Sequence, residues 1–150
     1  VIRPIISRHE RTGVNIADGF SRVKNGRAFG VFIMQKGPGA ENAYGGVAQA
    51  YADSIPILLL PAGQDRIQTE THPNFEAVEN YRGITKWAGN VNTASRIPEF
   101  MHMAYSQLRH GRPGPVLIEV PTDVQKEELS DSFDYESVKR LSSAARPRQF

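Results

Sequence analysis

Three consecutive residues, Arg8-His9-Glu10, carry the side chains of this sequence that are best placed for proton chemistry. They follow a short apolar run, Val1–Ile6, and open a segment with helical spacing, Glu10–Val23. A glutamate between a buried strand and a helix stands in a partly dry place, where a carboxyl group exchanges protons near neutral pH. The alternative is that Glu10 only complements the helix dipole and that His9 orients the turn. These residues alone leave both readings open.

A second candidate is the loop Gly37-Pro38-Gly39, with Lys36 before it and Asn42 shortly after it. Two glycines around a proline of fixed φ let a backbone pass close to a flat ring. The alternative is a plain strand-to-helix turn. Gln64 follows another apolar run, where it either lines a pocket or is solvated.

The elements that must position these residues alternate between apolar, β-rich runs and segments with helical spacing. The predicted strands are Ile2–Ser7, Phe29–Met34, Ile55–Pro61, Thr85–Ala88 and Val116–Val120, and the predicted helices are Glu10–Val23, Ala40–Tyr51, Phe75–Tyr81 and Ile97–Arg109. This alternation predicts right-handed crossovers and an α/β fold, a parallel sheet with helices on both faces. Ligands of such sheets bind beyond the carboxyl ends of the strands, so we expect Glu10 and the Gly37–Gly39 loop on one rim.

The first predicted helix has an inward face that contains Val14 and Ala17, together with either Phe20 or Ser21. Asn25-Gly26 is a typical helix end. Asp18 and Arg22 are spaced i, i+4 and are expected to form a surface pair. Trp87 is expected in the core.

Composition narrows the class of protein. Hydrophobic residues make up 39% and charged residues 23% of the 150, as in an ordinary globular domain. The net charge of +2 comes from scattered Lys and Arg, which favours no nucleic-acid partner. The absence of cysteine excludes disulfides and thiolate metal sites, and it fits a reducing, cytoplasmic compartment. The longest apolar run, Ile55–Ala62, contains two prolines and is too short to span a membrane.

Six motifs occur in a fixed order along the chain. They are Arg8-His9-Glu10, Ala17-Asp18-Gly19-Phe20-Ser21-Arg22, Gly37-Pro38-Gly39-Ala40-x-Asn42, Ala50-x-Ala52-Asp53-Ser54-x-Pro56-Ile57, Thr85-Lys86-Trp87 and Gly111-Arg112-Pro113-Gly114-Pro115-Val116. Together they resemble the pyrimidine-binding domain of thiamine-diphosphate enzymes, and most closely the large catalytic subunit of acetolactate synthase. Six ordered motifs are far more specific than a lone Gly-Pro-Gly.

The resemblance implies a role for each candidate residue. The family glutamate that matches Glu10 hydrogen-bonds N1′ of the cofactor's aminopyrimidine ring and favours its imino tautomer, which activates the cofactor for attack on a 2-keto acid. Glu10 is therefore the expected catalytic residue. The expected cofactor-binding set is Glu10, Gly37, Pro38, Gly39 and Asn42, and the expected substrate or channel set is Lys36, Gln64, Phe75 and Glu76.

The resemblance also implies cofactors, partners and domains. Thiamine diphosphate is expected, with Mg²⁺ held by a Gly-Asp-Gly and Asn pattern that this chain lacks, so no metal ligand is assigned here. FAD binding stays open, because that site belongs to the family's central domain. We expect a homodimer or homotetramer. Residues 1–124 are expected to form the pyrimidine-binding domain without the family's first strand and helix, and 125–150 a linker with a marginal helix at Tyr135–Leu141. As a piece of a longer enzyme, the isolated chain is expected to be inactive.

Two positions depart from the acetolactate synthase pattern. Lys36 stands where the family has a small hydroxyl residue, and Glu76 stands where it has Gln. The leading prediction is acetolactate synthase-like decarboxylation and carboligation, by a transferase or lyase. One alternative is a decarboxylase or carboligase of the oxalyl-CoA, benzoylformate or sulfoacetaldehyde type. The other is a non-catalytic assembly module, against which the presence of Glu10 argues.

Overall fold

The computed structural model describes residues 3–129. Its strands are β1 (Gly30–Met34), β2 (Ile57–Gly63), β3 (Trp87–Asn90) and β4 (Val116–Pro121). Its α-helices are α1 (Glu10–Lys24), α2 (Pro38–Ala52), α3 (Ala77–Tyr81) and α4 (Ile97–Arg109). Each lies within three residues of its predicted range. The prediction for Tyr135–Leu141 and most of the predicted linker lie outside the described residues.

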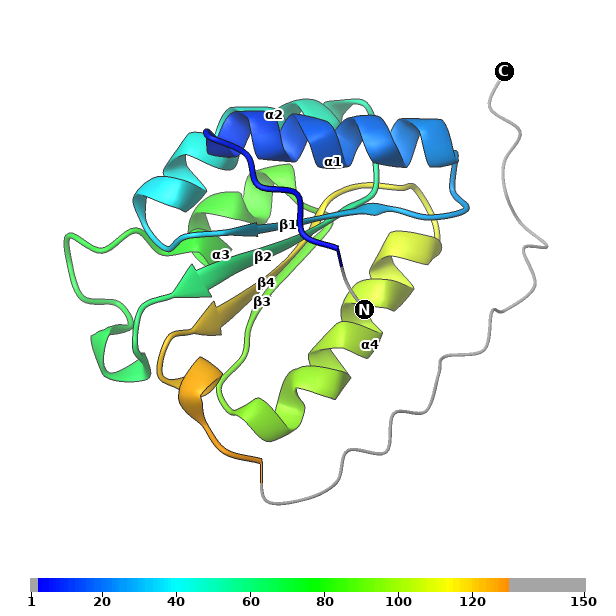
Figure 1. Cartoon of the computed structure of the whole chain (residues 1–150). Coiled ribbons are helices and arrows are strands. Elements are labelled where there is room, and N and C mark those ends of the chain that lie inside the picture. The colour runs from blue at the N-terminus through cyan, green and yellow to red at the C-terminus, as the bar shows by residue number, and fades with distance from the viewer. Residues whose placement is uncertain (1–2, 130–150) are drawn as a thin grey trace.

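The four strands form one parallel sheet in the order β1-β2-β4-β3. Figure 1 shows the arrowheads of the neighbouring β2 and β4 pointing the same way, toward the loops that follow them. β2 and β4 lie in the middle and are buried along most of their length. Nearly continuous apolar runs are what a parallel sheet covered on both faces requires.

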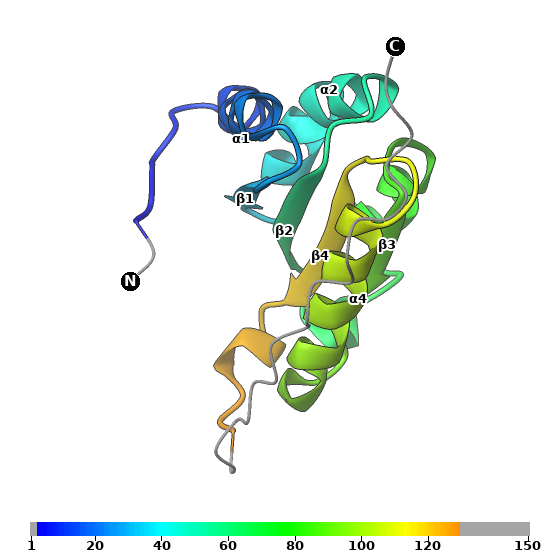
Figure 2. The same cartoon turned by 90° about the vertical axis from the view of Figure 1, so that its right-hand side faces the viewer.

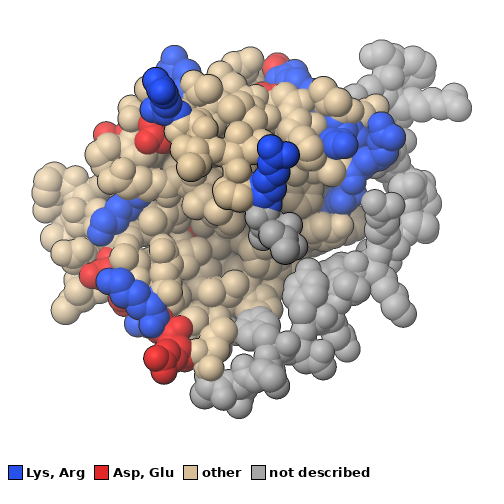
Figure 3. Space-filling model, viewed as in Figure 1, with Lys and Arg blue, Asp and Glu red and all other residues tan. Residues whose placement is uncertain are grey.

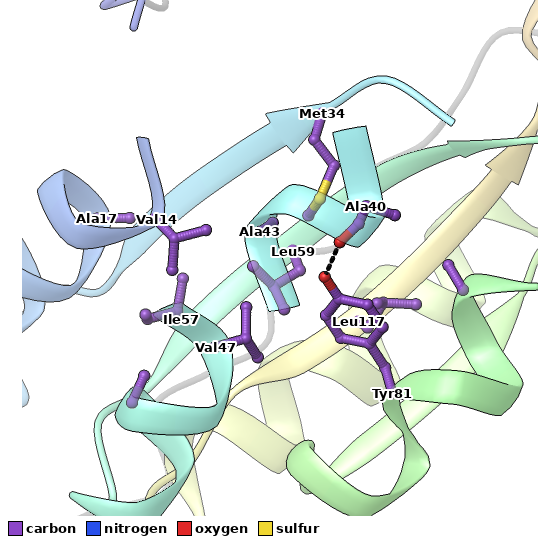
Figure 4. Packing of buried hydrophobic residues seen from close by; sticks show 12 residues of the cluster. Val14, Ala17, Met34, Ala40, Ala43, Val47, Ile57, Leu59, Tyr81 and Leu117 are labelled. Carbon is purple, nitrogen blue, oxygen red and sulfur yellow. Dashed lines mark hydrogen bonds between the residues drawn. The ribbon is translucent and has the colours of Figure 1, made fainter. Parts of the chain in front are cut away.

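Helices cover both faces of this sheet, as Figure 2 shows. Alternate residues of β2 and β4 enter two separate cores, because side chains alternate across a strand. On one face Ile57, Leu59 and Leu117 pack with α1, α2 and α3 (Figure 4). On the other face Leu58, Val116 and Ile118 pack with α4 and with the partly buried Trp87. The predicted fold class is confirmed.

The predicted strand Ile2–Ser7 is wrong for the part that the structure describes. Residues 3–7 have no regular secondary structure, and the side chains of Ile5 and Ile6 are 73% and 93% exposed. In Figure 2 this segment stands away from β1 and does not join the sheet. An apolar run forms a strand only where a neighbouring strand completes its hydrogen bonds, and β2 is the strand that pairs with β1 in the described sheet.

The contacts of α1 refine two predictions. Ser21, not Phe20, faces inward: Ser21 is 2% exposed and its hydroxyl group donates to the Pro56 carbonyl at 2.6 Å. Asp18 is also buried, and Arg22 pairs with it while reaching Asp53 of α2's C-terminal end at 2.6 Å. The expected surface pair is therefore one half of a bridge that joins α1 to α2.

Close packing of α1 on β1 predicts a large effect at Gly30. A Cβ atom there would lie 2.6 Å from the Ala17 Cα atom, against backbone that cannot rotate away. We expect Gly30→Ala to lower the free energy of unfolding by about 1–3 kcal/mol, as overpacked cores do. Urea unfolding measures this. Gly19→Ala on the open side of the same helix, with no atom within 4 Å, is the control and should stabilise by about 0.5–1 kcal/mol. Equal effects at the two glycines would contradict the packing argument.

Candidate functional site

The candidate site lies at the rim formed by the carboxyl ends of the strands. The Gly37–Gly39 loop follows β1, and Gln64 follows β2. Glu10 is the first residue of α1, which packs beside α2. The parallel sheet therefore gathers residues that are far apart in sequence.

Glu10 and Asn42 are in direct contact, which the sequence did not specify. The Asn42 side-chain amide donates to Glu10 Oε2 at 3.2 Å. Among residues 3–129 no other side chain donates a hydrogen bond to the Glu10 carboxylate. One carboxylate oxygen is thus held in place, while Oε1 keeps its capacity to bind another donor.

Gly39 lies next to this carboxylate, at a buried position that has no room for a side chain. A Cβ atom at Gly39 would lie 3.7 Å from Glu10 Oε1 and 2.9 Å from Gln35 Cβ. A larger side chain would therefore crowd Glu10. The carboxylate of Glu10 therefore lies beside backbone that carries no side chain.

The local backbone explains why α1 begins at Glu10. His9 is the N-cap residue of α1, with extended backbone (φ −148°), and its Nδ1 atom accepts from the Arg11 N–H at 3.2 Å. The helix therefore begins at Glu10 and not earlier. The expected turn-orienting role of His9 is present, and it is the device that sets Glu10 at the rim.

The start of α2 is fixed by the unusual backbone of the loop. Gly37 has φ 61° and ψ −113°, which an L side chain rarely adopts. Pro38 then opens the helix with its fixed φ. Lys36, just before the loop, is partly buried.

The predicted channel residues form a second group. Phe75 packs against the core that α1, α2 and α3 share, and Glu76 Oε1 accepts from the Glu70 N–H at 3.1 Å. Glu76 also lines a hollow of about 270 Å³, together with Glu70, Thr71, His72, Asn74 and Glu79. Within the described part of the chain, no hydrogen bond or ion pair joins Lys36, Gln64 or Glu76 to Glu10.

Tyr81 links the two groups, and the sequence did not single it out. Its hydroxyl group donates to the Ala40 carbonyl at 2.5 Å, as Figure 4 shows. Tyr81 is fully buried, and burial raises the pKa of its hydroxyl group. The bond joins α3, which follows Phe75 and Glu76, to the first turn of α2 beside Gly39.

Glu119 on β4 is a second residue that the sequence reasoning missed. It is 3% exposed, and burial raises the pKa of its carboxyl group to about 7. The Asn90 amide donates to its Oε2 at 3.2 Å. The available signal was a single acid at the fourth position of the apolar run Val116–Val120, on the same side as Leu117.

Charges and helix lengths add two observations on the described residues. On the face in Figure 3, Lys and Arg side chains lie scattered among neutral residues and do not form a continuous stripe. None of the described helices has the length and apolar character needed to cross a membrane.

Comparison with known proteins matches this chain to one family model and to relatives from plants, archaea and bacteria. The family model of the thiamine pyrophosphate enzyme, N-terminal TPP binding domain, matches residues 1–83. Acetolactate synthase 2 of Nicotiana tabacum, named chloroplastic, is 38% identical over 136 residues, which are 89% of this chain and 20% of that protein. A probable acetolactate synthase large subunit of Methanocaldococcus jannaschii is 39% identical over 128 residues, 83% of this chain and 21% of that protein. The acetolactate synthase large subunit of Lactococcus lactis is 35% identical over 135 residues, 89% and 23%. The chain thus spans about a fifth of the length of these relatives.

Proposed function

Since the chain belongs to the thiamine pyrophosphate enzymes, in the family of their N-terminal TPP binding domain, we propose that it supplies the aminopyrimidine half of a thiamine-diphosphate site. The observation that carries this proposal is the contact of Glu10 with Asn42 beside the bare backbone of Gly39. Bound thiamine diphosphate would supply the electron sink for breaking the bond next to a 2-keto group.

The proposed work of this chain is to bind and orient the ring and to hold one proton. Glu10 shares that proton with ring nitrogen N1′ through its carboxyl group, while Asn42 keeps the carboxylate from turning away. Gly37, Pro38 and Gly39 provide the backbone against which the ring lies. Lys36, Gln64, Phe75 and Glu76 are proposed to face the substrate.

The whole enzyme is proposed to be acetolactate synthase-like, joining two 2-keto acids with loss of carbon dioxide. The identities of 35–39% to the three acetolactate synthases support this reaction. We further propose that Mg²⁺ ligands come from another domain, and that a homodimer or homotetramer completes the site. We propose that residues 1–124 form the domain and residues 125–150 the linker. We also propose a cytoplasmic location.

A second candidate reaction follows from Lys36 and Glu76. A cation and an acid stand where the acetolactate synthase pattern has a hydroxyl group and a neutral amide, which suits a substrate with a different polar group. The test is to supply the complete enzyme with pyruvate, benzoylformate, sulfoacetaldehyde and oxalyl-CoA and to measure carbon dioxide and product. Condensation of pyruvate as the fastest reaction supports the leading proposal, whereas preference for another substrate supports the second candidate. No thiamine-diphosphate-dependent product from any of the four would contradict both.

The same proposal predicts weak cofactor binding by the isolated chain. The described residues contain no cluster of three His, Asp or Glu side chains that could hold a metal ion, and the cofactor's diphosphate is bound through such an ion. We expect calorimetric titration of the 150-residue chain with thiamine diphosphate and Mg²⁺ to give no micromolar site and no turnover. A micromolar, Mg²⁺-dependent site would show that the chain holds the diphosphate itself.

A further inference from the structure

The sheet provides an enclosed space for the side chain of Glu119. This side chain lies near the carboxyl end of β4 and is 3% exposed. Gly63 of the neighbouring β2 makes the room, because a Cβ atom there would lie 2.9 Å from Glu119 Cγ. A buried acid costs free energy unless it is well satisfied, so its contacts matter.

Groups from β3 and α3 act on the Glu119 carboxyl group. Asn90 of β3 donates its side-chain amide to Oε2 at 3.2 Å. Helix α3 packs against β4 and β3, and the backbone N–H groups of its first residues, Ala77 and Val78, lower the pKa of the carboxyl group. The carboxyl group therefore connects β4 to the backbone immediately after Phe75 and Glu76.

The balance of forces on Glu119 makes its charge sensitive to pH. Burial is the strongest influence and raises its pKa to about 7, while the donors from Val78, Ala77 and Asn90 oppose this. Glu76, on the segment that leads into α3, adds like-charge repulsion. From β2 the facing residue is Gly63, and from β3 it is the neutral Asn90. Among the described residues, Glu76 is thus the charged group whose field acts on Glu119.

Glu76 connects Glu119 to a more distant segment of the rim. Its carboxylate accepts from the Glu70 N–H at 3.1 Å and lines the hollow formed with Glu70, Thr71 and His72. A change of charge on Glu119 therefore acts on the start of α3 directly and on the segment from Glu70 to Glu76 through Glu76.

We propose that Glu119 is a positioning residue that fixes Phe75 and Glu76 at the rim and changes their placement when it gains or loses one proton. When ionised, it draws the Ala77 and Val78 N–H groups toward β4 and repels Glu76. When neutral, it releases both forces. The consequence for substrate rests on the proposed function, which assigns Phe75 and Glu76 to the substrate side.

The direct test is NMR titration of the isotopically labelled 150-residue chain across neutral pH. We expect the Ala77 and Val78 amide resonances, the Glu70 amide resonance and the Glu119 carboxyl carbon to shift with one common midpoint near neutrality. In Glu119→Gln the three amide shifts should disappear. Glu79→Gln, which changes an exposed acid on the same helix, is the matched control and should leave them intact.

Two results would overturn the proposal. One is that the Ala77 and Val78 amide resonances do not shift in the pH range where Glu119 titrates. The other is a response that persists in Glu119→Gln. The wild-type titration decides the first point without any variant, so the test does not depend on the variant's folding.

A second measurement separates this proposal from the proposed function. In the complete enzyme we expect the KM for the 2-keto acid to vary with pH near neutrality in wild type and to lose that variation in Glu119→Gln. The rate of C2 proton exchange should stay within a few-fold of wild type, because Glu10 is untouched. An unchanged KM profile would overturn the role of Glu119, whereas an enzyme without C2 exchange in wild type would overturn the proposed function alone.

Discussion

Glu10→Gln is expected to slow exchange of the C2 proton of bound thiamine diphosphate by about 10²–10⁴-fold in the complete enzyme. The carboxamide keeps the size of the side chain, and its oxygen still accepts from Asn42, which now donates at 3.2 Å. What is lost is the carboxyl group that we propose to share a proton with N1′. The measurement is exchange of the C2 proton for deuterium, followed by NMR after acid quench.

The controls must separate proton chemistry from folding. Glu41→Gln makes the same change at an exposed acid in the first turn of α2, next to Asn42. It should leave the exchange rate near that of wild type. Circular dichroism should show that Glu10→Gln keeps the fold, because Glu10 is only partly buried and His9 still caps α1. An unchanged exchange rate in Glu10→Gln would refute the assigned role.

The fold was largely predictable because its helices and strands have strong local signals. α4 was predicted at its observed bounds, Ile97–Arg109, since its apolar residues recur at helical spacing. β1 and β4 were predicted from continuous apolar runs. Such runs, however, do not reveal whether a partner strand exists. Ile2–Ser7 has the composition of β1, but the described part of it has no neighbour in the sheet and stays exposed.

The sequence named candidate residues for the site, but it could not show the contacts between them. Glu10 and Asn42 were named from their motifs, whereas their hydrogen bond depends on how α1 and α2 pack side by side. Asp18 was predicted as exposed because the i, i+4 spacing shows only its pairing with Arg22. The second partner of Arg22, Asp53, lies 35 residues after Asp18 in the chain. Tyr81 was hidden for the same reason, since its partner Ala40 lies 41 residues earlier.

The environment of Glu119 could not be predicted from the sequence pattern. A five-residue apolar run with one acid reads as an ordinary strand, because the sequence does not show which side chains surround that acid. Only the sheet order, with β4 between β2 and β3, places the carboxyl group between Gly63 and Asn90 under α3. Its burial in turn gives a stability prediction that composition could not suggest.

We expect Glu119→Gln to remove a pH-dependent loss of stability. In the folded chain burial raises the pKa of Glu119 from its ordinary value of 4.5 to about 7, so the folded state binds more protons than the unfolded state between these pH values. The free energy of unfolding must therefore fall as pH rises through this window. The loss is complete above about pH 7 and amounts to about 3 kcal/mol, from 1.36 kcal/mol for each pH unit between the two pKa values.

The variant cannot ionise at this position and should not show that loss. Its free energy of unfolding is expected to be close to that of wild type near pH 4.5 and to exceed it by about 3 kcal/mol near pH 8, since the difference between the two chains comes mainly from the titration of Glu119. Urea unfolding at a series of pH values measures the difference, with Glu79→Gln as the exposed control that should run parallel to wild type. Parallel curves for Glu119→Gln and wild type would mean that the buried carboxyl group titrates as it does in water. Burial would then exert no net force on its charge.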